Sequence, residues 1–138
     1  MPASDAPQNS GWLRALSIVD AAVAALAVWG GISLILGAPG FRWPVQWLAP
    51  LGLNSWVIPG VALIVVVGGP MFWGALASWR RTRHAPSVSL TAAVVMLGWL
   101  LVQWLVIESR TIVQVATALA DLLVIALACA SARRRRTW

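Results

Sequence analysis

Long apolar runs alternate along the chain with short stretches of polar, proline and glycine residues. A helix needs about 20 apolar residues to cross a bilayer core about 30 Å thick. Four runs approach this length, at residues 13–36, 57–79, 87–107 and 111–130. The pattern predicts an all-α fold, an integral membrane four-helix bundle made of two transmembrane hairpins.

The runs are continuously apolar, whereas the strands of membrane barrels alternate apolar and polar positions. Helices also satisfy every backbone polar group inside a single segment, as lipid requires. We expect a polar disordered tail at residues 1–11, one membrane domain at residues 12–132 and a basic tail at residues 133–138. Within the second run, Gly68-Gly69-Pro70 predicts a kink, because Pro removes a helical hydrogen bond.

Composition excludes an ordinary soluble domain. Hydrophobic residues make up 60% of the chain and charged residues 10%, whereas about a quarter of the residues of a soluble domain are charged. The net charge of +6 comes from ten Arg against four acids, with no Lys. Because the Arg lie at the ends of apolar runs, they indicate membrane topology, and no nucleic-acid partner is expected.

The distribution of Arg predicts the orientation. Residues 80–86 contain three Arg and residues 133–136 contain four, whereas the other two connections contain only Arg42 and Arg110. Short cytoplasmic loops are enriched in Lys and Arg, so both termini are expected in the cytoplasm. Abundant Arg, Ala, Val and Trp without Lys suggests a GC-rich bacterial genome, which favours the bacterial plasma (inner) membrane as the location of this multi-pass protein.

Residues for catalysis or metal binding are scarce. Cys129 is the only cysteine and His84 the only histidine, so a zinc site or a paired redox motif cannot be assembled from them. Phosphate-binding and nucleophile motifs are also absent from the sequence. We therefore expect no catalytic, cofactor-binding or metal-binding residues, and no enzyme activity.

The connection at residues 38–56 is too apolar for a free aqueous linker. We expect it to lie on the outer leaflet, with Trp43, Trp47 and Trp56 as interfacial anchors at headgroup depth. The alternative hypothesis makes this connection a lid over an outward-facing cavity or a docking surface.

Acidic residues inside apolar runs are costly in lipid and are often functional. Asp121 lies near the middle of the fourth run, and Asp20 lies near the inner boundary, where snorkelling would reduce its cost. Asp121 is expected either to fix helix packing, protonated or hydrogen-bonded to a neighbouring helix, or to bind a cation or relay protons. The candidate partners for that hydrogen bond are Gln103, Gln114, Ser33 and Ser17. Gln103 and Gln114 belong to the same candidate polar site, because amides in lipid seek partners across a helix pair.

Two short segments resemble uncharacterised small four-helix membrane proteins of actinobacteria and other bacteria. They are Ser55-Trp56-Val57-Ile58-Pro59-Gly60 and the segment from Gln103 to Gln114, which reads QWLVIESRTIVQ. The resemblance extends over about residues 12–130 and implies a four-span membrane fold. It brings no established reaction or ligand, so no site residue is transferred from it.

Three functions stay open from the sequence. The favoured one is a structural or accessory membrane protein that associates with itself or with a larger membrane complex, because no catalytic set is present. The second is a small cation- or proton-coupled transporter or channel that uses Asp121. The third is a binding module for lipid or another hydrophobic ligand beneath the connection at residues 38–56.

Overall fold

The computed structural model describes residues 8–106 and 112–136, and all regular elements of these residues are helical. This confirms the all-α prediction for that part of the chain. The elements are α1 (Gln8–Leu36), the 3-10 helix η1 (Val45–Leu51), α2 (Val57–Ala62), the π-helix η2 (Leu63–Gly68), α3 (Gly69–Trp79), α4 (Ala85–Val106) and α5 (Ile112–Arg136).

Three helical segments are long and apolar enough to cross a membrane, namely Gly11–Leu36, Val57–Trp79 and Ala85–Leu105. A fourth apolar helix, Gln114–Ala130, is shorter. The first three segments agree closely with the predicted runs at residues 13–36, 57–79 and 87–107. The prediction of these helices from run length is therefore confirmed, by length and composition.

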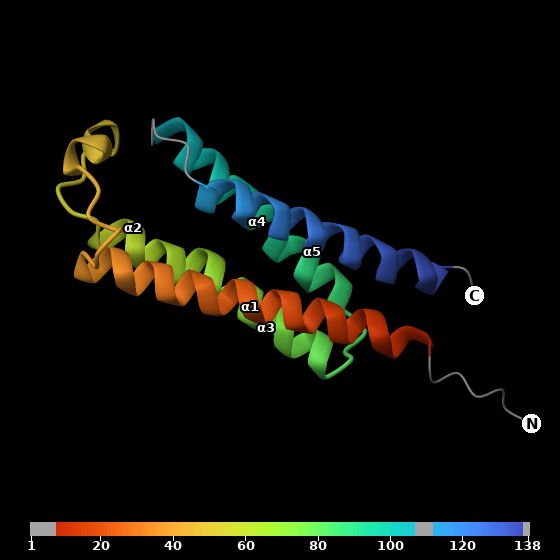
Figure 1. Ribbon diagram of the computed structural model, residues 1–138. Coiled ribbons are helices and arrows are strands. Elements are labelled where there is room, and N and C mark those ends of the chain that lie inside the picture. Colours follow the sequence, from red (N-terminus) through yellow and green to blue (C-terminus); the bar gives the residue numbers. More distant parts are fainter. Residues whose placement is uncertain (1–7, 107–111, 137–138) are drawn as a thin grey trace, which may run out of the picture.

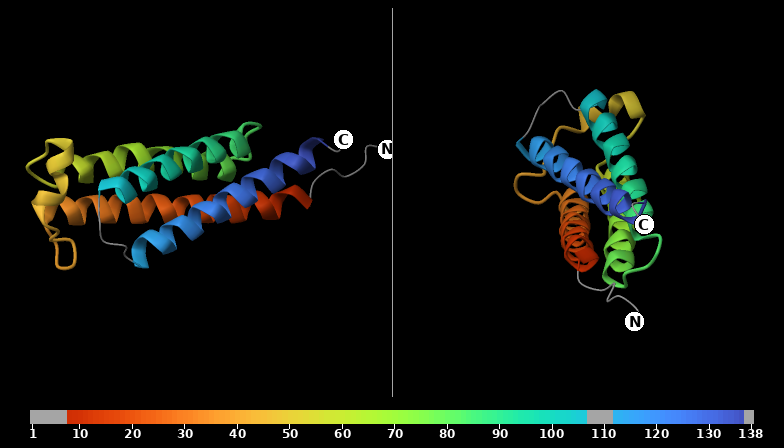
Figure 2. Two further views of the ribbon diagram at one scale, coloured as in Figure 1. Left: turned by 90° about the horizontal axis from the view of Figure 1, so that it is seen from above. Right: turned by 90° about the vertical axis from the view of Figure 1, so that its right-hand side faces the viewer.

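The helices form an elongated bundle in which α1 packs against α2, η2 and α3 on one side and against α5 on the other (Figure 1). Helix α4 packs between α3 and α5 and completes the bundle, while α5 crosses the others obliquely (Figure 2). Helix α1 starts and α5 finishes at one end, beside the connection at residues 80–84. We call this the arginine end, and we call the opposite end, formed by residues 37–56, the tryptophan end.

The core between the helices is rich in alanine. One group of buried residues joins α1, η2, α3 and α4, and a second joins α1, α4 and α5. Small side chains allow helices to approach closely, which supplies the van der Waals contact that lipid cannot replace. The first group contains Val23, Ala24, Ala27, Val67, Met71, Ala92 and Met96, and the second contains Leu16, Ala93, Val124, Leu127 and Ala128.

Helix ends differ from the predicted boundaries. Helix α1 begins at Gln8, so residues 8–11, which were assigned to the tail, are helical. Helix α4 begins at Ala85 with Pro86 in its first turn, where a missing backbone donor has no cost. Helix α5 continues to Arg136 because Arg is a good helix former. Residues 1–7, the predicted turn at Glu108-Ser109-Arg110 and residues 137–138 lie outside the described residues.

The predicted irregularity in the second run is a π-helical segment. It covers Leu63–Gly68, immediately before Gly69 and Pro70, so the distortion lies on the N-terminal side of the proline. A proline ring clashes with the carbonyl four residues earlier, here that of Val66. A wider turn accommodates that carbonyl, and such π-segments occur often at functional sites.

Helices α1 and α2 touch through their backbones near the tryptophan end. A Cβ atom added to Gly31 would lie 2.6 Å from the carbonyl oxygen of Gly60, and one added to Gly60 would lie 2.7 Å from the carbonyl oxygen of Gly31. Both distances are too short for any side chain. This reciprocal glycine contact therefore fixes the separation of the two helices.

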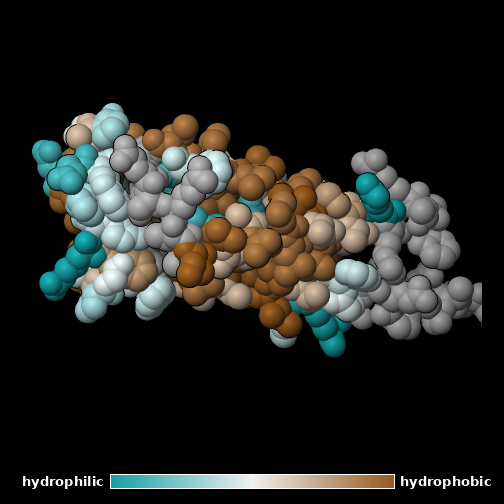
Figure 3. All heavy atoms as spheres, turned by 45° about the horizontal axis from the view of Figure 1, so that its top comes forward, coloured by the Kyte–Doolittle hydropathy of each residue, from teal (hydrophilic) through white to brown (hydrophobic). Residues whose placement is uncertain are grey.

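Much of the visible surface of the bundle is apolar (Figure 3). In the view of Figure 3, hydrophobic residues form a broad belt, and polar residues gather toward both ends. Many large apolar side chains of the described helices are exposed, including Leu105 at 79% and Ile112 at 88%. A surface of this kind is matched by lipid and not by water.

Candidate functional site

A polar group of residues lies between α1, α3 and α4, nearer the arginine end. The hydroxyl of Ser89 on α4 donates a hydrogen bond of 2.5 Å to Asp20 Oδ2 on α1, and both residues are fully buried. Ser17, one turn before Asp20, donates to the carbonyl oxygen of Ala75 on α3 at 2.9 Å. These two bonds join α1 to two helices, α3 and α4, that are far from it in sequence.

Gly74 on α3 makes room for the carboxyl group. A Cβ atom at this position would lie 2.7 Å from Asp20 Oδ2 and 3.1 Å from Ser89 Oγ. Asp20 therefore packs directly on the backbone of α3, where only a residue without a side chain allows it. Ser78 lies one turn from Gly74 on the same face of α3. Its hydroxyl is buried and has no hydrogen-bond partner in the described structure.

We call these residues the Asp20 cluster: Ser17, Asp20, Gly74, Ser78 and Ser89. It contains four of the six buried polar or charged residues of the described chain, the other two being Ser33 and Asp121. The second oxygen of the Asp20 carboxyl group, Oδ1, is buried and makes no hydrogen bond within the described residues.

The prediction for Asp20 was wrong in one respect. We expected its carboxyl group to be relieved by snorkelling toward the inner boundary, but the side chain is 0% exposed and turns into the bundle. Snorkelling requires a path along the lipid-facing surface. Helix α1 instead presents Asp20 to α3 and α4, where Ser89 supplies a hydrogen bond.

The structural prediction for Asp121 was also wrong in its partner. Asp121 is 0% exposed, and neither of its carboxyl oxygens has a hydrogen-bond partner in the described structure, so no bond to Gln103, Gln114, Ser33 or Ser17 forms. Asp121 and Asp20 are not hydrogen-bonded to each other either. Asp121 lies on α5, one turn before Val124, which belongs to the apolar group that joins α1, α4 and α5.

The two amide residues of the predicted polar site, Gln103 and Gln114, do not belong to the Asp20 cluster. Gln103 lies on α4 and lines a pocket near the tryptophan end, away from the Asp20 cluster. Gln114 is half-buried near the start of α5. The four residues of the predicted polar site are therefore in different parts of the bundle. Asp20 lies instead with Ser89, Gly74 and Ser78.

The tryptophan end carries a network of aromatic rings. Trp43 is central, with ring centroids 6.0 Å from Phe41, 6.4 Å from Trp47 and 5.3 Å from Trp56. The indole nitrogen of Trp56 also donates to the carbonyl oxygen of Trp43 at 3.0 Å. The three predicted anchor residues thus fold against one another and hold residues 37–56 in one compact unit.

This unit covers an apolar pocket of about 200 Å³, which we call the tryptophan pocket. Trp43 and Trp56 line it, whereas Trp47 does not. Gln103 is the one lining residue that is neither aliphatic nor aromatic. The remaining lining residues are Leu34, Leu48, Leu51, Leu53, Ile58, Pro59, Ala62, Trp99 and Val102.

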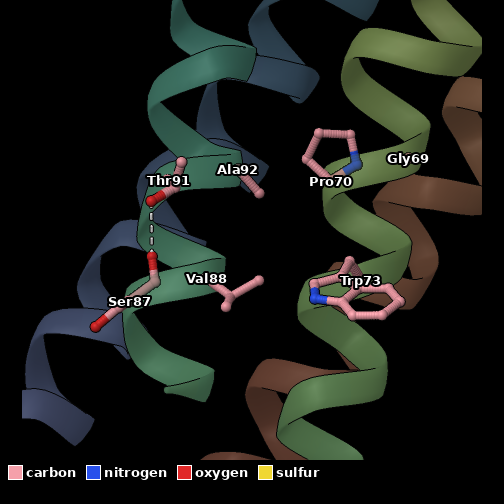
Figure 4. Close-up of a pocket in the computed structure, with 7 residues that line it drawn as sticks. All are labelled: Gly69, Pro70, Trp73, Ser87, Val88, Thr91 and Ala92. Carbon is pink, nitrogen blue, oxygen red and sulfur yellow. Dashed lines mark hydrogen bonds between the residues drawn. The ribbon is translucent and has the colours of Figure 1, made fainter.

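A second hollow is a groove of about 410 Å³ between α3 and α4 (Figure 4). Pro70 and Trp73 face it from α3, and Val88 and Ala92 face it from α4. The hydroxyl of Thr91 donates to the carbonyl oxygen of Ser87 at 2.9 Å, so it is used inside α4. The groove therefore presents a mainly apolar surface at the side of the bundle.

Comparison with known proteins identifies no relative. No protein-family model, curated protein or solved structure matches the chain. The resemblance carried by Ser55–Gly60 and Gln103–Gln114 therefore stays a prediction.

Proposed function

We propose that this chain is a four-span protein of the bacterial inner membrane that binds the hydrocarbon chain of a lipid in the tryptophan pocket. Three membrane-length helices and the shorter apolar helix Gln114–Ala130 support the four spans. The arginine end, with Arg80, Arg81 and Arg83 in its connection, is then cytoplasmic by the positive-inside rule. In this orientation the tryptophan pocket lies at the outer leaflet.

The tryptophan pocket is the observation that carries the proposal. Its lining is almost wholly aliphatic and aromatic, so it offers burial to an apolar ligand and few hydrogen bonds to a polar one. Its volume of about 200 Å³ is below the roughly 300 Å³ at which pockets for drug-sized ligands begin. That size suits a segment of an acyl chain better than a complete cofactor.

The depth of the pocket also favours a lipid. Tryptophan is enriched where membrane meets water, so the ring network of Trp43, Trp47 and Trp56 supports a position of the covering unit at headgroup level. The pocket beneath it then lies at the level of the upper acyl chain. A lipid would enter with its chain inward and its headgroup outward.

Transport through Asp121 has weaker support. Neither the tryptophan pocket nor the α3–α4 groove is lined by Asp20 or Asp121. An accessory role also has weaker support, because the exposed apolar side chains are distributed over all the described helices, as lipid-facing residues are. These side chains single out no partner surface.

A photocrosslinking experiment tests the proposal. The protein would be placed in nanodiscs of phosphatidylglycerol that carries a photoreactive acyl chain, and labelled peptides would be mapped by mass spectrometry. We expect labelling of residues 48–62. Ala62→Phe fills the pocket and should abolish this labelling, because Ala62 lines the pocket.

Val61→Phe is the matched control. Val61 is the neighbouring residue, is 47% exposed and does not line the pocket, so the variant adds the same side chain outside it. Labelling should persist in this control and in Trp47→Ala. Equal labelling of Ala62→Phe and Val61→Phe would refute the pocket as the lipid site.

A further inference from the structure

In the described structure, no positively charged side chain forms a hydrogen bond with the Asp20 carboxyl group. Helices α3 and α4 have no ionisable side chain, and α1 has only Arg14 besides Asp20. Arg14 is exposed. Helix α5 contributes Asp121, Cys129 and the arginines at residues 133–136, which belong to the arginine end. No described cation pairs with the Asp20 carboxyl group.

An ionised carboxyl group in this place would be strongly disfavoured. Moving an unpaired charge into an apolar interior costs far more than one hydrogen bond returns, so such groups are neutralised instead. Ser89 donates one hydrogen bond to Oδ2, while Oδ1 is buried and without a partner in the described structure. The group therefore needs one positive charge, carried either by a proton or by a metal cation.

We propose that Asp20 and Ser89 form a proton-binding site between α1, α3 and α4. The proton bonds to Oδ1, because Oδ2 already accepts the hydrogen of the Ser89 hydroxyl. Binding converts the carboxylate and a proton from water into a neutral carboxyl group, and release reverses that step. No other reactant takes part.

The packing at Gly74 favours a proton over a metal ion. A single carbon atom at this position would already be only 2.7 Å from Oδ2 and 3.1 Å from Ser89 Oγ. A sodium ion needs several oxygen ligands around it, and the backbone of α3 closes the Oδ2 side of the carboxyl group, which leaves only Oδ1 to a bound cation. A proton needs no such space.

Infrared spectroscopy of the full chain in phosphatidylglycerol nanodiscs tests this inference at neutral pH. A protonated carboxyl group has a C=O stretching band that a carboxylate lacks. We expect the wild type to show this band with the frequency of a hydrogen-bonded carboxyl group. Asp20→Asn should lose this hydrogen-bonded band. Asp121→Asn should retain it, because Asp121 is buried without a hydrogen bond and its own protonated carboxyl group would absorb at higher frequency.

Ser89→Ala provides a second variant that keeps the acid. Loss of the hydrogen bond to Oδ2 should shift the Asp20 band to higher frequency without removing it. If Asp20→Asn does not fold, this shift decides the question, and an unshifted band in Ser89→Ala overturns the proposal. A hydrogen-bonded C=O band of unchanged strength in Asp20→Asn also overturns the proposal. So does a wild-type band that sodium chloride abolishes, because sodium would then be the bound cation.

Discussion

Helix α1 contacts the second apolar run, which forms α2, η2 and α3, at both ends of the bundle, and the two contacts are of different kinds. At the tryptophan end, α1 and α2 touch through the backbones of Gly31 and Gly60. At the arginine end, α1 and α3 meet through a side chain, because the Asp20 carboxyl group packs on Gly74 and accepts a hydrogen bond from Ser89. Backbone contact sets a distance only, whereas the polar contact also selects the rotation of each helix.

The two contacts differ in rigidity. A backbone clash cannot be relieved by a rotamer change, so the glycine contact at the tryptophan end is rigid. A clash with Asp20 can be relieved in part by turning its side chain, although the hydrogen bond to Ser89 is then lost. Substitutions that add a single methyl group at each end therefore distinguish the two contacts.

The largest effect is expected at the tryptophan end. Gly31→Ala places a methyl group 2.6 Å from a backbone oxygen, and we expect a loss of about 3 kcal/mol in the free energy of unfolding, at the upper end of overpacking costs. Unfolding in mixed micelles with increasing denaturing detergent measures this loss. Gly30→Ala is the control, since its methyl group would meet only Leu63 Cδ2 at 3.5 Å. Similar losses in both variants would disprove the rigid contact.

A smaller effect is expected at the arginine end. Gly74→Ala should cost about 2 kcal/mol, because the added methyl group meets Asp20 Oδ2 and Ser89 Oγ. If the clash is with the side chain, the variant Gly74→Ala/Asp20→Ala should lose less stability than the sum of the two single variants. Unfolding of all four proteins in the same micelles gives this coupling. Strict additivity would mean that Asp20 does not pack on Gly74.

The smallest effect concerns the acid that has no partner. Asp121→Leu replaces a buried polar group, whose oxygens make no hydrogen bond in the described chain, with an apolar side chain of larger but comparable size. We expect a gain of about 1 kcal/mol in the free energy of unfolding, because an unsatisfied buried group is removed. Asp20→Leu should be destabilised in the same assay, since Ser89 loses its acceptor. A loss of stability in Asp121→Leu would indicate a polar contact at this position.

The sequence patterns predicted the helices but did not predict the rotation of each helix about its own axis. Runs of apolar residues are a local signal, so the first three spans and the irregularity before Pro70 could be predicted. The rotation of α1 depends on partners elsewhere in the chain, and the hydrogen bond from Ser89 to Asp20 joins residues 69 positions apart. Sequence alone therefore gave Asp20 the wrong surroundings.

A signal for the Asp20 cluster was nevertheless present. Ser17, Gly74, Ser78 and Ser89 are small or polar residues in apolar helices, all on the arginine side of their spans. Since these residues and Asp20 lie at similar distances from the arginine end, aligning the helices by that distance would have predicted the cluster. The tryptophan pocket gave a weaker signal, because its lining residues are ordinary apolar residues whose meeting depends on how residues 37–56 fold.

The separation of Asp20 from Ser89 also affects how the protein is made. Ribosomes add about 5 to 20 residues per second, so the 69 positions between the two residues correspond to roughly 3 to 14 s of synthesis. During this interval α1 has been produced and the hydrogen-bond donor of its acid has not. The carboxyl group of Asp20 therefore stays without this donor until α4 has been synthesised, and the contact between α1 and α4 forms only after that.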